Sequence, residues 1–238
     1  MKNITKRIKH VEPKNKKQKA FLNALADHPV VLATGAAGAG KTFLAAYAAL
    51  EALSYQFVGR IIIVRPIVAT EQIGYLPGTF QDKIEPYLLP LMDSFITLTD
   101  PKSVTEMLEV GSIEIAALAY MRGRTLGDAF IILDEAQNTT IDQMKMFVTR
   151  FGENVKVVIT GDATQSDIRG KNGLQWAIET FSDTKSVAHI KYESQEVVRS
   201  ALARELLTCI EKSERQGSTN NVKYPDTSDS REDNGSGV

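Results

Sequence analysis

The chain has 238 residues, of which 43% are hydrophobic and 24% charged, and its formal net charge is −1. This is the composition of a globular protein long enough for one α/β domain. No apolar run approaches the ~20 residues that a membrane-spanning helix needs, and the basic N-terminus lacks the apolar segment of a secretion signal. The single cysteine, Cys209, excludes an internal disulfide and a cysteine cluster for metal. We expect a soluble cytoplasmic protein, in the host cytoplasm if the chain is viral.

The start of the chain is strongly basic. Its first twenty residues contain one acid, Glu12, against a series of basic residues: Lys2, Lys6, Arg7, Lys9, Lys14, Lys16, Lys17 and Lys19. A basic arm over residues 1–13 could engage the backbone of a nucleic acid. A solvated terminus without a binding role explains the same charges, so both interpretations stay open.

Short apolar runs predict the strands. Three of them do not alternate with polar residues, as is typical of buried parallel strands: 30–33, 61–64 and 130–133. A fourth run, 155–159, is interrupted only by one lysine. Weaker candidates are 113–116 and 189–192, and helical patterns cover about 17–27, 41–54, 140–150, 172–181 and 195–212. Strands that alternate with helices predict an α/β fold, a mostly parallel sheet with helices on both faces.

Two segments depart from this alternation. Residues 70–110 hold four prolines and short helical pieces, and we expect an insertion over the edge of the sheet. From about residue 212 the chain is rich in Ser, Asn, Asp, Gly and Lys, with too few apolar residues to offset the entropy of ordering. The sequence therefore predicts one domain over 14–211, followed by a disordered polar tail over 212–238.

A glycine-rich run follows the first predicted strand and precedes the helical pattern at 41–54. It has the P-loop spacing Gly-x4-Gly-Lys-Thr and consists of Gly35, Ala36, Ala37, Gly38, Ala39, Gly40, Lys41 and Thr42. Such a loop folds its backbone N–H groups around phosphate at a helix N-terminus. Lys41 is expected to reach the β- and γ-phosphates and Thr42 to bind Mg²⁺, so ATP and Mg²⁺ are the expected cofactors.

Two adjacent acids end the predicted strand at 130–133. Asp134 has the position of a Walker-B aspartate, which holds Mg²⁺ through water. Glu135 is placed to orient and deprotonate an attacking water, which favours hydrolysis over phosphoryl transfer to a metabolite. We therefore expect an ATPase rather than a small-molecule kinase.

A third polar run, from Thr160 to Gln165, ends the predicted strand at 155–159. In P-loop proteins with an adjacent catalytic glutamate, this strand usually lies between the P-loop strand and the Walker-B strand. Its C-terminal end then faces the γ-phosphate, so the Gln165 amide could sense that phosphate or position water.

With these motifs the chain resembles the PhoH-like family, P-loop ATPases related to superfamily-1 helicases. The resemblance covers about residues 14–210, and its matching runs are 35–42, 64–66, 74–78, 119–126, 129–140, 143–150, 160–162 and Gln165. It implies a single RecA-like core in which Asp-Glu-Ala-Gln, residues 134–137, is the helicase-type motif II.

Further roles come from the resemblance alone. Gln18 has the position of a glutamine that hydrogen-bonds adenine, although a surface glutamine on a lysine-rich helix explains it equally well. Arg122 and Arg124 could contact phosphates of a single strand or a neighbouring subunit. Arg199 corresponds to an arginine that the family keeps, but the usual His-Pro after it is replaced by Ser200-Ala201.

The resemblance also implies a homo-oligomer. Superfamily-1 helicases complete the ATP site with arginines from a second RecA domain, for which this chain is too short. An arginine finger supplied by an adjacent copy predicts a head-to-tail ring, a hexamer, with Arg199 favoured over Arg122, Arg124 and Arg150. Two functions remain open: an ATP-driven, helicase-like motor on single-stranded RNA or DNA, and a nucleotide-dependent switch or assembly protein that acts on protein partners.

Overall fold

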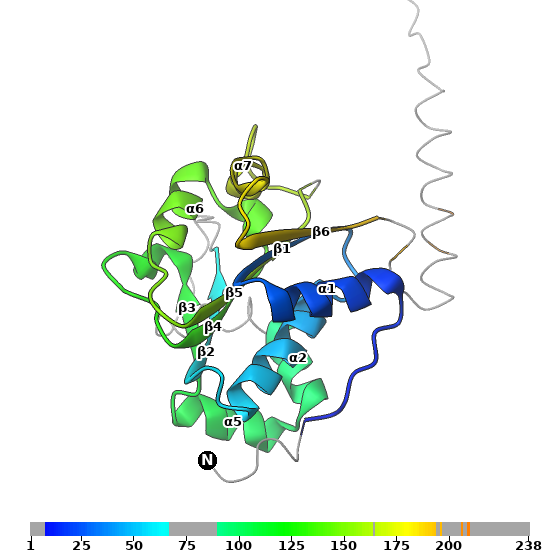
Figure 1. The fold of residues 1–238 in the computed structure, drawn as a ribbon, viewed down its shortest axis with the longest axis vertical. Helices are drawn as coiled ribbons and strands as arrows, with labels where there is room; N and C mark the ends of the chain where they lie inside the picture. The colour runs from blue at the N-terminus through cyan, green and yellow to red at the C-terminus, as the bar shows by residue number, and fades with distance from the viewer. Residues whose placement is uncertain are drawn as a thin grey trace, which may run out of the picture. The chain divides into compact units, whose positions relative to one another are not determined.

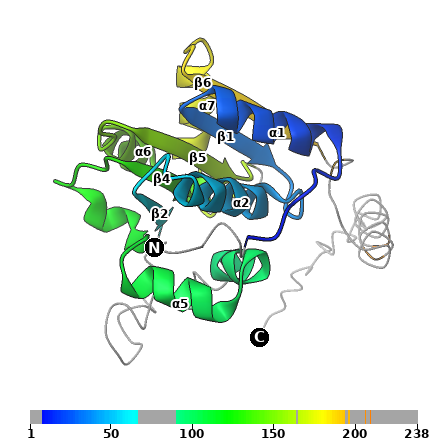
Figure 2. The same ribbon diagram turned by 60° about the horizontal axis from the view of Figure 1, so that its bottom comes forward.

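The computed structural model describes residues 8–66, 90–163 and 165–193, and the single residues 196, 206 and 209. Residues 1–198 form one structural unit and 199–238 a second. The sheet and the helices that cover it belong to the first unit (Figures 1 and 2). Most of the expected basic arm, most of the helix expected at 195–212 and the expected tail lie outside the described residues. The domain bounds therefore stay a prediction.

Six parallel strands form the sheet, in the order β3-β2-β4-β5-β1-β6. In chain order they are β1 (Val30–Gly35), β2 (Arg60–Arg65), β3 (Ile113–Ala117), β4 (Ala129–Leu133), β5 (Val155–Gly161) and β6 (Val187–Tyr192). All six predicted strands are confirmed, the two weak ones included. The expected position of β5, between β1 and β4, is confirmed as well.

Helices cover both faces of this sheet, so the α/β prediction is confirmed (Figure 1). One face carries α1 (Lys16–Asp27), α2 (Lys41–Ser54), the helical residues 90–98 and α5 (Pro101–Glu109). The other carries α6 (Ile141–Val148), α7 (Gly173–Phe181) and the short 3₁₀ helices η1 (Leu118–Met121) and η2 (Ala136–Asn138). Among the described helices, none is long and apolar enough to cross a bilayer.

The non-alternating apolar runs follow from this three-layer arrangement. Successive residues of a strand point to opposite faces, and each face has a hydrophobic core of its own. Ile61 and Ile63 of β2 pack in the core with α2, whereas Ile62 between them packs in the core with α6 and α7. All three are fully buried.

Side-chain caps set where several helices begin. Thr140 and Gln143 form a capping box at α6, in which the Thr140 hydroxyl accepts the backbone N–H of Gln143 and the Gln143 amide oxygen accepts that of Thr140. Asn172 and Gln175 do the same at α7. These caps satisfy N–H groups that a helix start leaves without partners.

The segment between β2 and β3 differs from the insertion that the sequence predicted. Its part 67–89 lies outside the described residues. The remainder is helical, and its apolar side chains join the same core as α1 and α2: Leu91, Phe95, Leu98, Val104 and Met107. Because β2 and β3 are parallel neighbours, their connection must cross over one face of the sheet. The described part is thus a section of a helical layer.

A glycine at the start of α7 provides a test of this packing. A Cβ at Gly173 would lie closer than 3.0 Å to atoms of Thr139, Thr140 and Met144. We expect Gly173→Ala to lower the free energy of unfolding by about 1–3 kcal/mol, because the contact between α6 and α7 must open. Urea denaturation measures this change.

Gly127→Ala is the matched control, since the nearest atom to its added Cβ would be the Glu153 carbonyl oxygen at 3.4 Å. Its cost should stay within about 0.5 kcal/mol. Equal losses for the two variants would contradict the packing described.

Candidate nucleotide site

The glycine-rich loop joins the end of β1 to the start of α2, as its sequence predicted. Gly35 has φ 120°, and a Cβ there would collide with the backbone carbonyl oxygen of Tyr192 in the neighbouring strand β6. Only glycine fits this position. The loop delivers the chain to α2 with Gly40 as its N-cap and no side-chain cap. The first N–H groups of α2 are therefore available to an anion.

Lys41 lies inside this loop. Its Nζ donates hydrogen bonds to the carbonyl oxygens of Gly35, at 2.5 Å, and Ala36, at 2.9 Å. Burial lowers the pKa of the Lys41 ammonium below its ordinary 10.5, while the negative charges of Asp162, Asp134 and Glu135 act in the opposite direction. A phosphate in the loop would offer this buried cation a stronger partner than two carbonyls.

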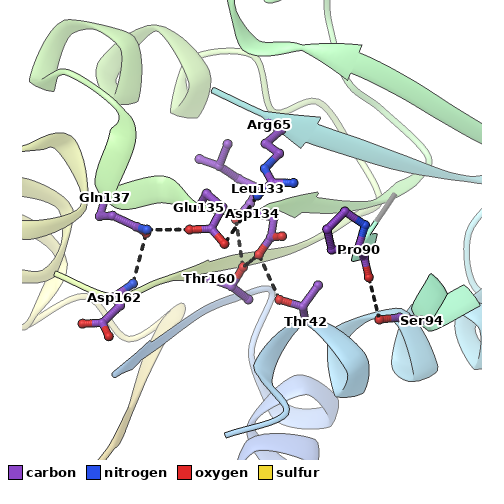
Figure 3. A network of polar contacts seen from close by, with 10 residues as sticks. All are labelled: Thr42, Arg65, Pro90, Ser94, Leu133, Asp134, Glu135, Gln137, Thr160 and Asp162. Carbon is purple, nitrogen blue, oxygen red and sulfur yellow. Dashed lines mark hydrogen bonds and ion pairs between the residues drawn. The ribbon is translucent and has the colours of Figure 1, made fainter. Parts of the chain in front are cut away.

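Asp134 is held from two sides (Figure 3). Its Oδ1 accepts hydrogen bonds from the hydroxyls of Thr42, at 3.0 Å, and Thr160, at 2.5 Å. The side chain is buried, with 6% of the residue exposed. The first turn of α2 and the ends of β4 and β5 therefore converge on one carboxylate.

The residues present fit a magnesium ion. Mg²⁺ takes oxygen ligands and usually keeps several waters, so it needs only one or two protein ligands besides the nucleotide phosphates. Thr42 and Asp134 supply a hydroxyl and a carboxylate in direct contact. Within the described residues no group of three or more His, Cys, Asp or Glu side chains could hold a metal alone. Such a site would bind the ion together with a nucleotide.

Glu135 has an unusual backbone conformation, with φ 55° and ψ 40°, in the left-handed region that non-glycine residues rarely adopt. Its Oε1 lies 3.6 Å from Nη2 of Arg65, at the end of β2. Its Oε2 accepts a hydrogen bond from Nε2 of Gln137 at 2.5 Å. Figure 3 shows the carboxylate between these two partners. The strained turn thus presents a carboxylate with a fixed orientation.

Gln137 connects this carboxylate to β5. Its side-chain oxygen accepts the backbone N–H of Asp162 at 3.0 Å, and only 2% of the residue is exposed. Asp162 itself is buried and close enough to Lys41 to affect its pKa. Gln137 therefore ties the orientation of Glu135 to the chain that leaves β5.

Gln18 is buried against the glycine-rich loop, so the interpretation as a surface glutamine is wrong. Its Nε2 donates to the Ala39 carbonyl at 3.0 Å, and its Oε1 accepts the backbone N–H of Lys14 at 2.7 Å. Asn15, the N-cap of α1, accepts the Gln18 backbone N–H and fixes the start of the helix. The adenine-binding role stays a prediction.

The contacts described above do not involve the side chains of the remaining predicted site residues. Gln165 is exposed on the turn after β5, where its backbone N–H donates to Asp162. Arg122 is exposed after η1, at the end of β3. Arg124 pairs with Glu114, with 2.5 Å between Nη2 and Oε1, and shares this acid with Arg60. Arg150 follows α6, and Arg199 lies outside the described residues.

Four residues of the site had no predicted role: Arg65, Gln137, Thr160 and Asp162. Each lies within a run that carried the family resemblance. Arg65, Thr160 and Asp162 also lie at or just after the C-terminal end of a predicted strand. Because parallel strands place their ligands at that edge, this position was the signal that could have identified them.

Comparison with known proteins agrees with this geometry. A family model described as "PhoH-like protein" matches residues 10–211. The PhoH-like protein of Mycobacterium tuberculosis (strain ATCC 25618 / H37Rv) is 45% identical over 218 residues, which are 90% of this chain and 62% of the relative. Protein PhoH of Escherichia coli (strain K12) is 44% identical over 199 residues, 82% of this chain and 56% of that protein.

The chain spans about three fifths of the length of these relatives. Among solved structures, the large terminase of bacteriophage HK97 has a similar fold. It matches with a TM-score of 0.56 and 16% identity over 89% of this chain and 49% of the terminase. The family match and the similar structure together show a P-loop NTPase fold.

The contact between Thr160 and Asp134 can be tested through metal affinity. We expect Thr160→Val to raise the Mg²⁺ concentration required for half-maximal nucleotide binding by about 10- to 100-fold, because the carboxylate loses a partner that orients it. Titration of a fluorescent ADP analogue at increasing Mg²⁺ measures this shift.

Thr99→Val serves as the control, since the buried Thr99 hydroxyl donates to the Phe95 carbonyl within its own helical segment. It should leave the Mg²⁺ dependence unchanged. An unchanged dependence in Thr160→Val would refute the role given to Thr160.

Proposed function

The chain belongs to the PhoH-like family, and we propose that it hydrolyses ATP with Mg²⁺ and uses the energy to move along single-stranded RNA or DNA. The observation that carries the hydrolytic part is the pair of adjacent carboxylates with different partners. Asp134 contacts Thr42 of the phosphate loop, whereas Glu135 contacts Arg65 and Gln137. Asp134 can thus bind the metal, while Glu135 orients and deprotonates the attacking water.

The reaction follows from these positions. Backbone N–H groups of the loop and Lys41 would hold the phosphates, and Mg²⁺ held at Thr42 and Asp134 would supply positive charge against them. Glu135 accepts a proton from a water whose oxygen attacks the γ-phosphorus. The bond between that phosphorus and the bridging oxygen breaks, and its electron pair leaves with ADP. Gln137 keeps the Glu135 carboxylate oriented during this step.

Support for a nucleic-acid partner comes from an arginine near the C-terminal ends of the strands, where the candidate site also lies. Arg122 is exposed at the end of β3, and β3 and β4 both flank β2. A polymer at Arg122 would therefore lie beyond β3, which only β2 separates from β4, the strand that leads into Asp134. The lysines before residue 20, together with Arg7, add positive charge for the phosphate backbone. The alternative, a switch that acts on protein partners, requires no such contact.

We also propose that the site is completed by a second copy of the chain. Transition-state charge in phosphoryl transfer calls for an arginine finger, which can contribute ~10³–10⁵ in rate. Arg65 contacts the candidate base of its own subunit, and Arg124 forms a 2.5 Å ion pair with Glu114. Arg122, Arg150 and Arg199 remain as candidates, and a head-to-tail ring of six copies would place one of them at each site.

Glu135→Gln tests the hydrolytic role. The amide keeps the shape of the side chain but accepts no proton, so we expect kcat to fall by about 10²–10⁴-fold while ATP still binds. Phosphate release and ATP binding are measured on the same preparations.

Glu153→Gln, a change of an exposed glutamate in the turn before β5, is the matched control and should behave as the wild type. If Glu135→Gln hydrolyses ATP at the wild-type rate, Glu135 is not the base. The same assay with oligouridylate and oligothymidylate separates the two functions: a motor is stimulated several-fold, and a protein-directed switch is not.

The arginine finger is tested by measuring the ATPase activity of arginine variants together with their oligomeric state. We expect kcat to fall by at least ~10³-fold in the one arginine variant, among Arg122→Ala, Arg150→Ala and Arg199→Ala, that removes the finger. Mixing this variant with Lys41→Ala should restore part of the turnover, because one subunit then supplies the finger and the other the phosphate loop. If sedimentation shows a monomer and this monomer hydrolyses ATP at the full rate, the finger is not supplied by a second copy.

A further inference from the structure

Arg65 lies between the candidate base and the exposed turn after β3. It is the last residue of β2, and its neighbours in the sheet are β3 on one side and β4 on the other. In register, Arg65 is opposite Ala117, the last residue of β3, from which η1 leads directly to Arg122. On the other side its guanidinium reaches Glu135. Arg65 therefore contacts the base from the strand that lies next to β3, the strand that leads to Arg122.

The two contacts of the Glu135 carboxylate differ in length and in exposure. Gln137 is buried, and its other end is fixed by the Asp162 backbone N–H. The Arg65 contact is longer, at 3.6 Å, and both side chains are partly exposed, 20% for Arg65 and 40% for Glu135. A partly exposed ion pair is weak and can be exchanged for another anion. The Arg65 contact is therefore the replaceable one.

A phosphodiester is the anion best suited to replace Glu135. Guanidinium groups bind phosphate oxygens through paired, charge-assisted hydrogen bonds, which are stronger than a single contact to a carboxylate at 3.6 Å. A strand that contacts Arg122 would bring such phosphates next to the end of β2. RNA and DNA offer the same group.

We propose that Arg65 couples polymer binding to hydrolysis. In the free protein it restrains the Glu135 carboxylate, so that this group is less available to water. A backbone phosphate of the bound strand takes the guanidinium, and the carboxylate, still held by Gln137, is released to the attacking water. This inference rests on the proposed function and assigns Arg65 a positioning role rather than a catalytic one.

Arg60 offers a matched control in the same strand. It is the first residue of β2 and also pairs with a glutamate, Glu114, at 3.4 Å. It lies at the opposite edge of the sheet from Glu135. A change at Arg60 thus removes the same kind of ion pair from the same strand without touching the candidate base.

The experiment measures kcat and KM for ATP of Arg65→Gln, Arg65→Lys and Arg60→Gln, with and without oligouridylate or oligothymidylate. Without polymer, we expect kcat of Arg65→Gln to rise about two- to five-fold, the range that a partly exposed ion pair can account for, with KM unchanged. Polymer should add no further stimulation to this variant. Arg65→Lys keeps the charge and should retain part of the stimulation, and Arg60→Gln should match the wild type.

A lower kcat of Arg65→Gln without polymer, with its stimulation ratio intact, would overturn the proposal, because Arg65 would then simply hold Glu135 in its productive orientation. Failure of the proposed function is a separate result: a wild type that neither oligonucleotide stimulates would refute the polymer partner. The rate of Arg65→Gln without polymer still decides whether Arg65 restrains Glu135, since no polymer enters that measurement.

Discussion

The carboxylate of Asp134 links the start of α2 to the end of β5, and the candidate site depends on these two segments keeping their positions. It accepts hydrogen bonds from Thr42 in the first turn of α2 and from Thr160 in β5. The Asp134 backbone N–H donates to the Val64 carbonyl in β2. Four segments that are distant in sequence therefore meet at one buried acid. Loss of either hydroxyl contact would leave the buried carboxylate with fewer partners, which is costly in a low-dielectric interior.

The order of the strands makes this convergence possible. With β5 between β1 and β4, the residues that end these three strands become neighbours at one edge of the sheet. The apolar runs that form the strands are buried on both faces, and this fixes their register. The strained turn at Glu135 follows directly after β4, so the sheet also determines where the candidate base points. Packing in the two hydrophobic cores thus offsets the cost of the buried charges of Asp134 and Lys41 and of the left-handed backbone at Glu135.

The sequence allowed prediction of features that depend on local pattern. The strands, the phosphate loop and the positions of Asp134 and Glu135 directly after a strand follow from residue types and spacing along the chain. Partners across strands were not predictable in the same way, because register between distant segments determines them. Gln137, whose side chain contacts Glu135, therefore received no predicted role, and the role of Gln165, exposed on the turn beyond β5, stays a prediction. The pairing of Arg124 with Glu114 was missed for the same reason.

The account is tested most directly by a crystal structure of the protein with Mg²⁺ and a non-hydrolysable ATP analogue. It predicts that Nζ of Lys41 leaves the carbonyl oxygens of Gly35 and Ala36 for the β- and γ-phosphates. It also predicts Mg²⁺ on the Thr42 hydroxyl, with the Asp134 carboxylate reached through water. A nucleotide bound outside the loop, or a metal held by other side chains, would contradict it.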